Sequence, residues 1–179
     1  MNEGEASPDP VGQPRAYQDF LLALLGDDDP AAVQSSTAAS LREVAAEAGP
    51  DLFKEPEPGE WSAAQVIAHL CDAEIAMSGR YRFILTQDAP VLLGYDQEVW
   101  IERLHDGDEP VADSLDAFEA LRKVNVTLWV RSSAEDRARV GMHAERGAES
   151  FDLSFRMIAG HDRLHLGQIR RALEAVRRS

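Results

Sequence analysis

Two histidines stand four residues apart in the segment GHDRLHLGQI at residues 160–169. Apolar residues at spacings of three and four extend this segment into an amphipathic helix that begins near Ser150. In a helix, residues four positions apart lie one above the other on the same face. The pattern therefore predicts that His161 and His165 can bind one metal ion together, if a third ligand comes from another part of the chain.

A third histidine lies in the segment WSAAQVIAHL at residues 61–70. Ser62 followed by Gln65 has the spacing of a capping box, which predicts that a helix begins there and runs to about residue 86. The histidine of this segment falls on the apolar stripe of its helix, as the later pair does on its own helix. We therefore predict one metal site shared by two helices. Its predicted ligands are His69, His161 and His165.

The histidine pair on the last helix has a simpler interpretation on its own, because two core histidines can be satisfied by hydrogen bonds. An inward histidine on a second helix favours the metal, since adjacent buried imidazoles are not easily charged and a metal ion uses their lone pairs. Three nitrogen ligands leave coordination positions for water or substrate, as in reactive zinc sites. Such ligands suit zinc, nickel, iron and copper, so the residue types alone do not choose the ion.

The composition of the chain narrows its class and its partners. Its 179 residues are 44% hydrophobic and 28% charged, which is typical of one globular domain. The formal net charge of -14, from 32 acidic and 18 basic residues, argues against nucleic acid and anionic membranes as partners. The single cysteine excludes an intramolecular disulfide and a cysteine-built metal cage. Without an apolar signal segment or a membrane-spanning run, we expect a cytoplasmic protein.

The order of helical patterns and breaks predicts the fold. Residues 1–14 are polar and acidic and predict a flexible N-terminal tail, and residues 15–179 predict a single domain. Helical patterns cover residues 15–25, 31–48, 62–86, a short stretch ending near 104, 113 or 114 to 131, and 150 to about 178. Residues 134–149 predict a charged loop with one helical turn, and no segment has a convincing strand pattern. Four long helices with shorter ones in the connections predict an all-α four-helix bundle.

The remaining candidate residues receive structural interpretations. We expect His105 at the surface and His143 in an exposed loop, from which it could also reach one end of the bundle. Cys71 points away from the preceding histidine and is predicted to be a small buried packing residue. Asp72 and Asp162 are either acceptors for imidazole N–H groups or solvated helix charges.

Several of these segments, taken in order, resemble the DinB-like superfamily. The resemblance rests on Trp61-Ser62, HLCDAE at residues 69–74, Tyr95-Asp96-Gln97 with Trp100, and HDRLH at residues 161–165 with Gln168-Ile169. It spans about residues 41–176. It implies a four-helix bundle in up-down-down-up order, commonly a homodimer, with a divalent metal on His69, His161 and His165.

The resemblance also implies two kinds of chemistry. Some relatives are thiol-dependent transferases or isomerases, such as bacillithiol transferases and the mycothiol-dependent maleylpyruvate isomerase, and others are labelled metal-dependent hydrolases. Our first hypothesis is a metal-dependent enzyme that activates a low-molecular-weight thiol or water against a small electrophile, with thiol transfer slightly preferred by analogy. Zinc or nickel is the expected metal, ahead of iron or copper. Trp61, Tyr95 and Trp100 either line the cleft or pack in the core.

Two further hypotheses use the same residues without catalysis. The protein could be a metal- or ligand-binding module of a stress response, or a structural bundle whose core contains histidines. In the structural case, His165→Ala would change neither metal content nor Tm beyond an ordinary core deletion.

Overall fold

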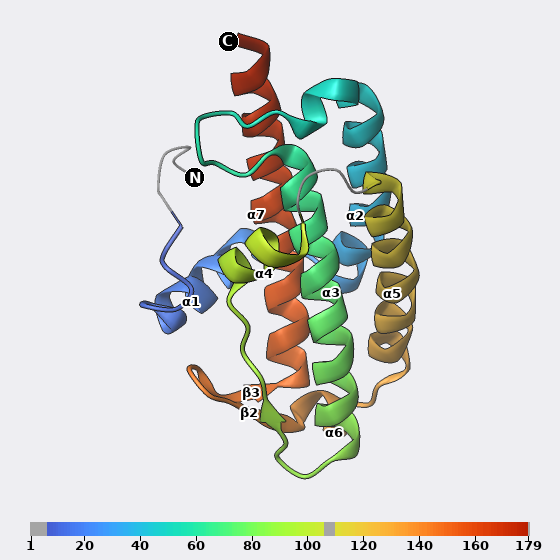
Figure 1. Cartoon of the computed structure of the whole chain (residues 1–179). Helices are drawn as coiled ribbons and strands as arrows, with labels where there is room; N and C mark the ends of the chain where they lie inside the picture. The colour runs from blue at the N-terminus through green and yellow to red at the C-terminus, as the bar shows by residue number, and fades with distance from the viewer. Residues whose placement is uncertain (1–6, 106–109, 179) are drawn as a thin grey trace.

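The computed structural model describes residues 7–105 and 110–178, and four long helices form its main body (Figure 1). α2 (Pro30–Ala48) and α7 (Phe151–Arg178) run upward in Figure 1, whereas α3 (Ala63–Thr86) and α5 (Val111–Arg131) run downward. α2 and α3 each pack against both α5 and α7, so they lie at opposite corners of the bundle. This arrangement confirms the predicted four-helix bundle and its up-down-down-up order.

Shorter elements occupy the connections. They are α1 (Pro14–Leu25), the 3-10 helix η1 (Gly49–Phe53), β1 (Val91–Leu92), α4 (Gln97–Leu104), α6 (Ala134–Ala138), β2 (Val140–His143) and β3 (Gly147–Ser150). The expectation of a chain without strands is wrong, because β2 and β3 form an antiparallel hairpin and β1 pairs in parallel with β2. Gly147 follows the hairpin turn with a φ of 78°, in the left-handed region that glycine adopts readily.

Local sequence signals decide where two of the long helices begin. Ser62 accepts a hydrogen bond from the backbone of Gln65, and the Gln65 side chain accepts one from the backbone of Ser62. This confirms the capping box predicted for α3. α5 begins at Val111, so the expected start at residue 113 or 114 is wrong. The reason is Pro110, whose fixed φ of -62° already directs the chain into the first turn.

A layer of buried polar side chains divides the interior into two hydrophobic clusters. One cluster includes Leu41, Leu70, Phe118 and Ile169, and the other includes Tyr81, Trp129, Phe151 and Phe155. Between them, all four long helices contribute to a set that we call the polar layer: Gln34, Thr37, His69, Glu74, Arg122, Asn125, His161, Asp162 and His165. Buried polar groups are unfavourable without partners, so the contacts within this layer decide what it can do.

α1 packs closely against α7 at Gly160. A Cβ atom at this position would lie 2.0 Å from the carbonyl oxygen of Leu21. We expect Gly160→Ala to lower the free energy of unfolding by about 1–3 kcal/mol, because overpacking outweighs the better helix propensity of alanine. Gly167→Ala is the matched control, since a Cβ there would meet only the flexible side chain of Arg171 at 3.2 Å. Urea unfolding of both variants checks this, and equal losses of stability would contradict it.

The first six residues of the predicted N-terminal tail lie outside the described residues, and the division at residue 14 stays a prediction. Within the described part of that segment, Asp9, Pro10 and Val11 lie along a cavity next to α1. Among the described residues, no helix combines the length and apolar character needed to cross a lipid bilayer.

Candidate metal centre

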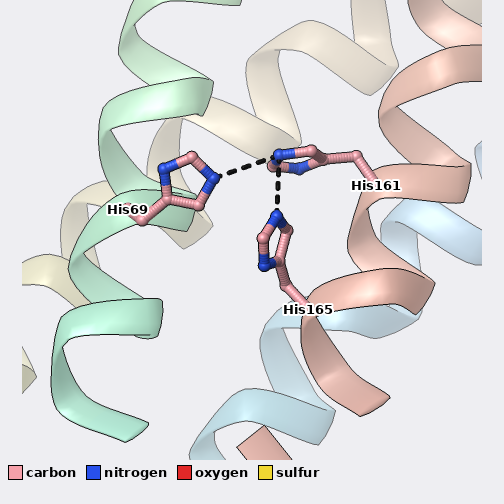
Figure 2. Close-up of side chains that lie close together, drawn as sticks. All are labelled: His69, His161 and His165. Atoms are coloured by element: carbon pink, nitrogen blue, oxygen red, sulfur yellow. Dashed lines mark hydrogen bonds between the residues drawn. The ribbon is translucent and has the colours of Figure 1, made fainter. Parts of the chain in front are cut away.

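The three predicted histidines meet in the polar layer (Figure 2). His69 comes from α3, and His161 and His165 come from successive turns of α7. The Nε2 atom of His161 lies 3.2 Å from that of His69 and 3.1 Å from that of His165. The three ligand atoms all lie within 4.8 Å of one another, and all three residues are buried. Two distant segments of sequence thus bring three imidazoles to one point.

The spacing of these nitrogen atoms fits one shared metal ion. Zinc–nitrogen bonds measure about 2.0–2.1 Å, so two nitrogen ligands of a tetrahedral ion lie about 3.3 Å apart. The separations of 3.2 and 3.1 Å around His161 are close to that value. Imidazole nitrogen also suits nickel, copper and iron, so the donor set fits a divalent transition metal without selecting one.

Gln168 fixes the tautomer of one ligand. Its Oε1 atom lies 2.7 Å from His165 Nδ1, and an amide oxygen can only accept, so Nδ1 carries the proton. The Nε2 lone pair of His165 then faces the other two imidazoles. Outer-shell hydrogen bonds of this kind orient metal ligands and raise their basicity.

Burial keeps all three imidazoles neutral. It lowers the pKa of His69 and of His161 well below 6.5, and neighbouring imidazoles lower both further. Burial also lowers the pKa of His165 to about 4, although the hydrogen bond with Gln168 acts in the opposite direction. Only a neutral imidazole offers its lone pair to a metal, so all three are ready to bind one at neutral pH.

The metal-free protein is therefore expected to lose stability in mild acid. Below pH 6.5 the unfolded chain protonates these histidines, whereas the folded state keeps them neutral down to about pH 4 for His165. Each such histidine lowers the free energy of unfolding by about 1.4 kcal/mol per pH unit in that window. We expect Tm to fall between pH 6.5 and 5 and to stay level from pH 7 to 8. His69→Gln should show a shallower slope, and a level Tm down to pH 5 in the unmodified protein would contradict the prediction.

A cavity of about 320 Å³ reaches the ligand set and is lined by His69 and His161. Its walls come from α1, α3, α7, the β2–β3 hairpin and the segment before α4, and they include Tyr17, Met77, Arg80, Tyr95, His143 and Glu149. Burial raises the pKa of Tyr17 and of Tyr95 to about 12, so both hydroxyl groups can donate hydrogen bonds at neutral pH. The cavity thus places two tyrosines and two of the predicted metal ligands along the same walls.

The charged members of the polar layer form a network beside the histidines. Arg122 on α5 donates to Glu74 on α3 at 3.0 Å and to Asp162 on α7 at 3.0 Å. Thr37 on α2 donates to Asp162 at 2.8 Å. Burial alone would lower the pKa of Arg122, but the attraction of the two carboxylates outweighs it and keeps the guanidinium charged. Because Asp162 directly follows His161, the network ties all four long helices together at the level of the metal ligands.

The structure changes several interpretations of single residues. His105 is partly buried and not the exposed residue that was expected, because its Nε2 lies 2.8 Å from the Asp72 carboxylate and 16% of its side chain is exposed. Asp72 thus accepts from an imidazole, but not from a predicted metal ligand. Asp162 is neither solvated nor an imidazole acceptor, since it belongs to the charged network. His143 is buried on β2, where alternation turns every second residue inward. Cys71 is a buried core residue, as predicted.

Aromatic and charged residues complete the surroundings of the site. Of the three aromatic candidates, Tyr95 lines the cavity. Trp100 packs against Tyr95 and Trp61 packs against His69, with ring centroids 4.4 and 5.3 Å apart. Sequence reasoning missed Arg80 in the cavity wall. The available signal was its position three turns after His69, on the same face of α3.

A four-helix bundle with three convergent buried histidines defines the class of this molecule as a helical bundle with a candidate metal-binding site. Comparison with protein families then gives the family: the DinB superfamily model matches residues 32–169. This chain belongs to the DinB superfamily.

Curated relatives share part of the chain. The Oceanobacillus iheyensis protein named "Putative metal-dependent hydrolase OB0782" is 34% identical over 111 residues, which are 62% of this chain and 64% of that protein. A second O. iheyensis protein, "Putative metal-dependent hydrolase OB0413", is 28% identical over 123 residues, 69% of this chain and 70% of that protein. This chain thus spans less than two thirds of the length of the first of these relatives.

A solved structure matches the fold over nearly the whole chain. It is YfiT from Bacillus subtilis, described as a probable metal-dependent hydrolase with an unusual four-helix bundle topology. The TM-score is 0.72 at 19% sequence identity, and the match covers 99% of this chain and 91% of YfiT. At this identity the likeness establishes the shared fold.

Proposed function

We propose that this protein is a metal-dependent hydrolase of small molecules whose ion is held by His69, His161 and His165. The observation that carries the proposal is the convergence of three buried, neutral imidazoles on a cavity that a small molecule can enter. The names of the curated relatives favour hydrolysis over the thiol transfer that the sequence alone slightly favoured.

The surrounding residues suit this chemistry. A bound divalent ion lowers the pKa of a coordinated water and polarises a carbonyl group. All three ligands are neutral, so they do not reduce the positive charge that acts on the substrate. The protonated hydroxyl groups of Tyr17 and Tyr95 can donate hydrogen bonds to a substrate oxygen and hold it in the cavity. Burial excludes bulk water, which strengthens each of these interactions.

A thiol transferase is the second candidate, because the same ligand set could activate a thiol in place of water. Cys71 cannot supply that thiol, since it is packed in the core and burial raises its pKa to about 11. A low-molecular-weight thiol would have to enter the cavity from solution. This requirement separates the two candidates experimentally.

The test uses protein loaded separately with zinc, nickel, iron(II) or copper. Release of 4-nitrophenol from 4-nitrophenyl esters is measured with and without an added small thiol. We expect saturable hydrolysis that chelation removes and metal restores, with none above background for His69→Ala. Release of 4-nitrophenol only when the thiol is added, with the thiol consumed in equal amount, would establish the transferase instead. Metal binding with neither reaction would overturn the proposal and leave a non-catalytic binding protein.

We further propose that the protein is a homodimer that acts on small molecules without nucleic acid or membrane partners. The dimer rests on the family resemblance, and the absence of nucleic acid rests on the net charge of -14. Light scattering coupled to size exclusion should give a mass of about twice 19.7 kDa. A single chain mass at working concentrations would contradict the dimer.

A further inference from the structure

Arg80 is a buried cation whose hydrogen bonds all go to neutral acceptors. Arg80 is 8% exposed, and its guanidinium donates to the backbone oxygen of Leu93 and to the sulfur of Met77. Among the described residues, no carboxylate forms an ion pair with it. Its Cζ atom also lies 6.0 Å from the centre of the Tyr95 ring, which is a neutral partner as well. Burial and the nearby positive charge of Arg146 lower the pKa of Arg80, and Glu149 and the neighbouring tyrosines offset this only in part. A buried guanidinium without an anionic partner is unfavourable unless a ligand supplies the anion.

Glu149 is the carboxylate that attracts Arg80 most strongly, but both of its oxygen atoms already have other partners. One Glu149 oxygen accepts from Arg146 at 2.7 Å and the other accepts from Ser154 at 2.7 Å. These two bonds hold Glu149 against the hairpin and the start of α7. Within the described residues, Arg80 therefore lines this cavity without an ion-pair partner.

The cavity has a graded chemical character along α3. His69, Ala73, Met77 and Arg80 all line it, so one face of the helix runs from the metal ligands to the guanidinium. The backbones of His69 and Arg80 lie about 16 Å apart along the helix axis, from the rise of about 1.5 Å per residue. The Arg80 guanidinium lies back toward Met77, at 3.4 Å from its sulfur, so the gap between the guanidinium and the metal ligands is shorter than this rise. Apolar residues between them include Leu21, Ala73, Met77, Met157 and Ile158. The wall thus offers a metal site at one end, an apolar middle and a cation at the other end.

Acidic residues at the opening restrict which anion can enter. Asp9, Asp96, Glu98 and Glu145 line the cavity and are exposed, whereas Arg80 is buried. Four carboxylates at the rim disfavour ligands with several negative charges. A monoanionic carboxylate suits the interior better than a phosphate dianion, and a guanidinium binds a carboxylate through two parallel hydrogen bonds.

We propose that Arg80 binds a carboxylate group of the substrate, so that the protein acts on short apolar acyl compounds with a carboxylate at the end remote from the bond that is broken. The inference rests on the proposed hydrolase function for the reaction itself. In that reaction water adds its oxygen to the acyl carbon, the bond to the leaving oxygen or nitrogen breaks, and the leaving atom receives a proton. The products are a dicarboxylate and an alcohol or an amine. The second proton of the water goes to solvent when an ester is cleaved and to the amine, as ammonium, when an amide is cleaved, and the guanidinium undergoes no chemical change.

Binding to the metal-free protein tests the role of Arg80 separately from catalysis. Hexanoate, 1-hexanol and inorganic phosphate are titrated by calorimetry and by their effect on Tm. We expect saturable binding of hexanoate and no matching effect of 1-hexanol or phosphate. Arg80→Gln should weaken hexanoate binding about tenfold or more, and Arg80→Lys should fall between, because lysine keeps the charge but not the paired donors.

Arg82→Gln is the matched control on the same helix. Arg82 donates to Asn125 and to the backbone of Ser78, and it does not line the cavity. It should leave hexanoate binding unchanged. Circular dichroism establishes that each variant is folded, and the hexanoate and hexanol comparison in the unmodified protein decides the question even if Arg80→Gln does not fold. Equal binding of both ligands, or tighter binding of phosphate, would overturn the inference.

A second comparison separates this inference from the proposed function. The metal-loaded protein is assayed with the mono-4-nitrophenyl ester of adipic acid and with 4-nitrophenyl hexanoate. We expect Arg80→Gln to lower the ratio of their kcat/KM values about tenfold. Hydrolysis with an unchanged ratio would overturn the role of Arg80 and leave the hydrolase standing. Arg80-dependent hexanoate binding without hydrolysis of either ester would support the role of Arg80 and overturn the hydrolase.

Discussion

His165→Ala is expected to lower metal affinity by at least about 100-fold, because it removes one of three ligands. Loss of a residue that only supports a ligand already costs roughly 10- to 100-fold in metal proteins. The measurement is the rise in Tm when metal is added to the metal-free protein. At a concentration of about 100 times the dissociation constant, a bound ion stabilises the unmodified protein by about 2.7 kcal/mol. The variant should lose nearly all of this increment at the same concentration.

Two further variants make the result specific. His105→Ala removes a partly buried histidine that pairs with Asp72, outside the ligand set, and should keep the full metal-dependent rise in Tm. Gln168→Ala leaves all three ligands in place but removes the acceptor from His165 Nδ1, so its metal affinity should be intermediate. The comparison uses the difference between loaded and metal-free protein, which cancels the packing lost with each side chain. A full increment in His165→Ala would mean that the histidines are core residues without a metal role.

The long helices could be predicted because their signals are local. The capping box at Ser62 and the apolar spacing along α3 and α7 depend on residues within a few turns of one another. The β2–β3 hairpin was missed because His143 and Gly147 stand in a charged segment that has no run of β-branched or aromatic residues. The strand β1 is two residues long and depends on a distant partner, so no local pattern could indicate it.

Some residues of the candidate site could also be predicted from the sequence, and others could not. Its histidines were predictable because a polar residue on the apolar stripe of a helix requires a partner, and imidazole is a common metal ligand. Arg122 and Asn125 also fall on the apolar stripe of α5, but their partners come from other helices. The sequence indicates that such residues are buried, whereas only the packing of the bundle shows that Glu74 and Asp162 satisfy Arg122. Arg80 belongs to the same group, with the difference that the described chain gives it no carboxylate.

Arg122→Ala is expected to lower the free energy of unfolding by about 3–5 kcal/mol, the usual effect of removing one partner from a buried charge network. The side chain is 4% exposed and its two carboxylate partners are each 1% exposed, so water cannot replace the guanidinium. The variant keeps Glu74 and Asp162 buried without their cation. Urea unfolding at pH 7 gives the change directly. Arg42→Ala is the surface counterpart, since Arg42 also contacts two acids, Asp116 and Glu119, but in solvent, and it should change stability little.

The loss of stability caused by unpaired buried charge can be separated from the loss caused by poorer packing. In Arg122→Met with Glu74→Gln and Asp162→Asn, no buried charge is left unpaired, so this triple variant should be more stable than Arg122→Met alone. Lower pH should act on the single variant in the same direction, because burial raises the pKa of Asp162 and protonation removes its uncompensated charge. The destabilisation caused by Arg122→Met relative to the unmodified protein should therefore be smaller at pH 5 than at pH 7. A triple variant less stable than the single one would show that the hydrogen bonds of the network, and not its charge balance, hold the four helices together.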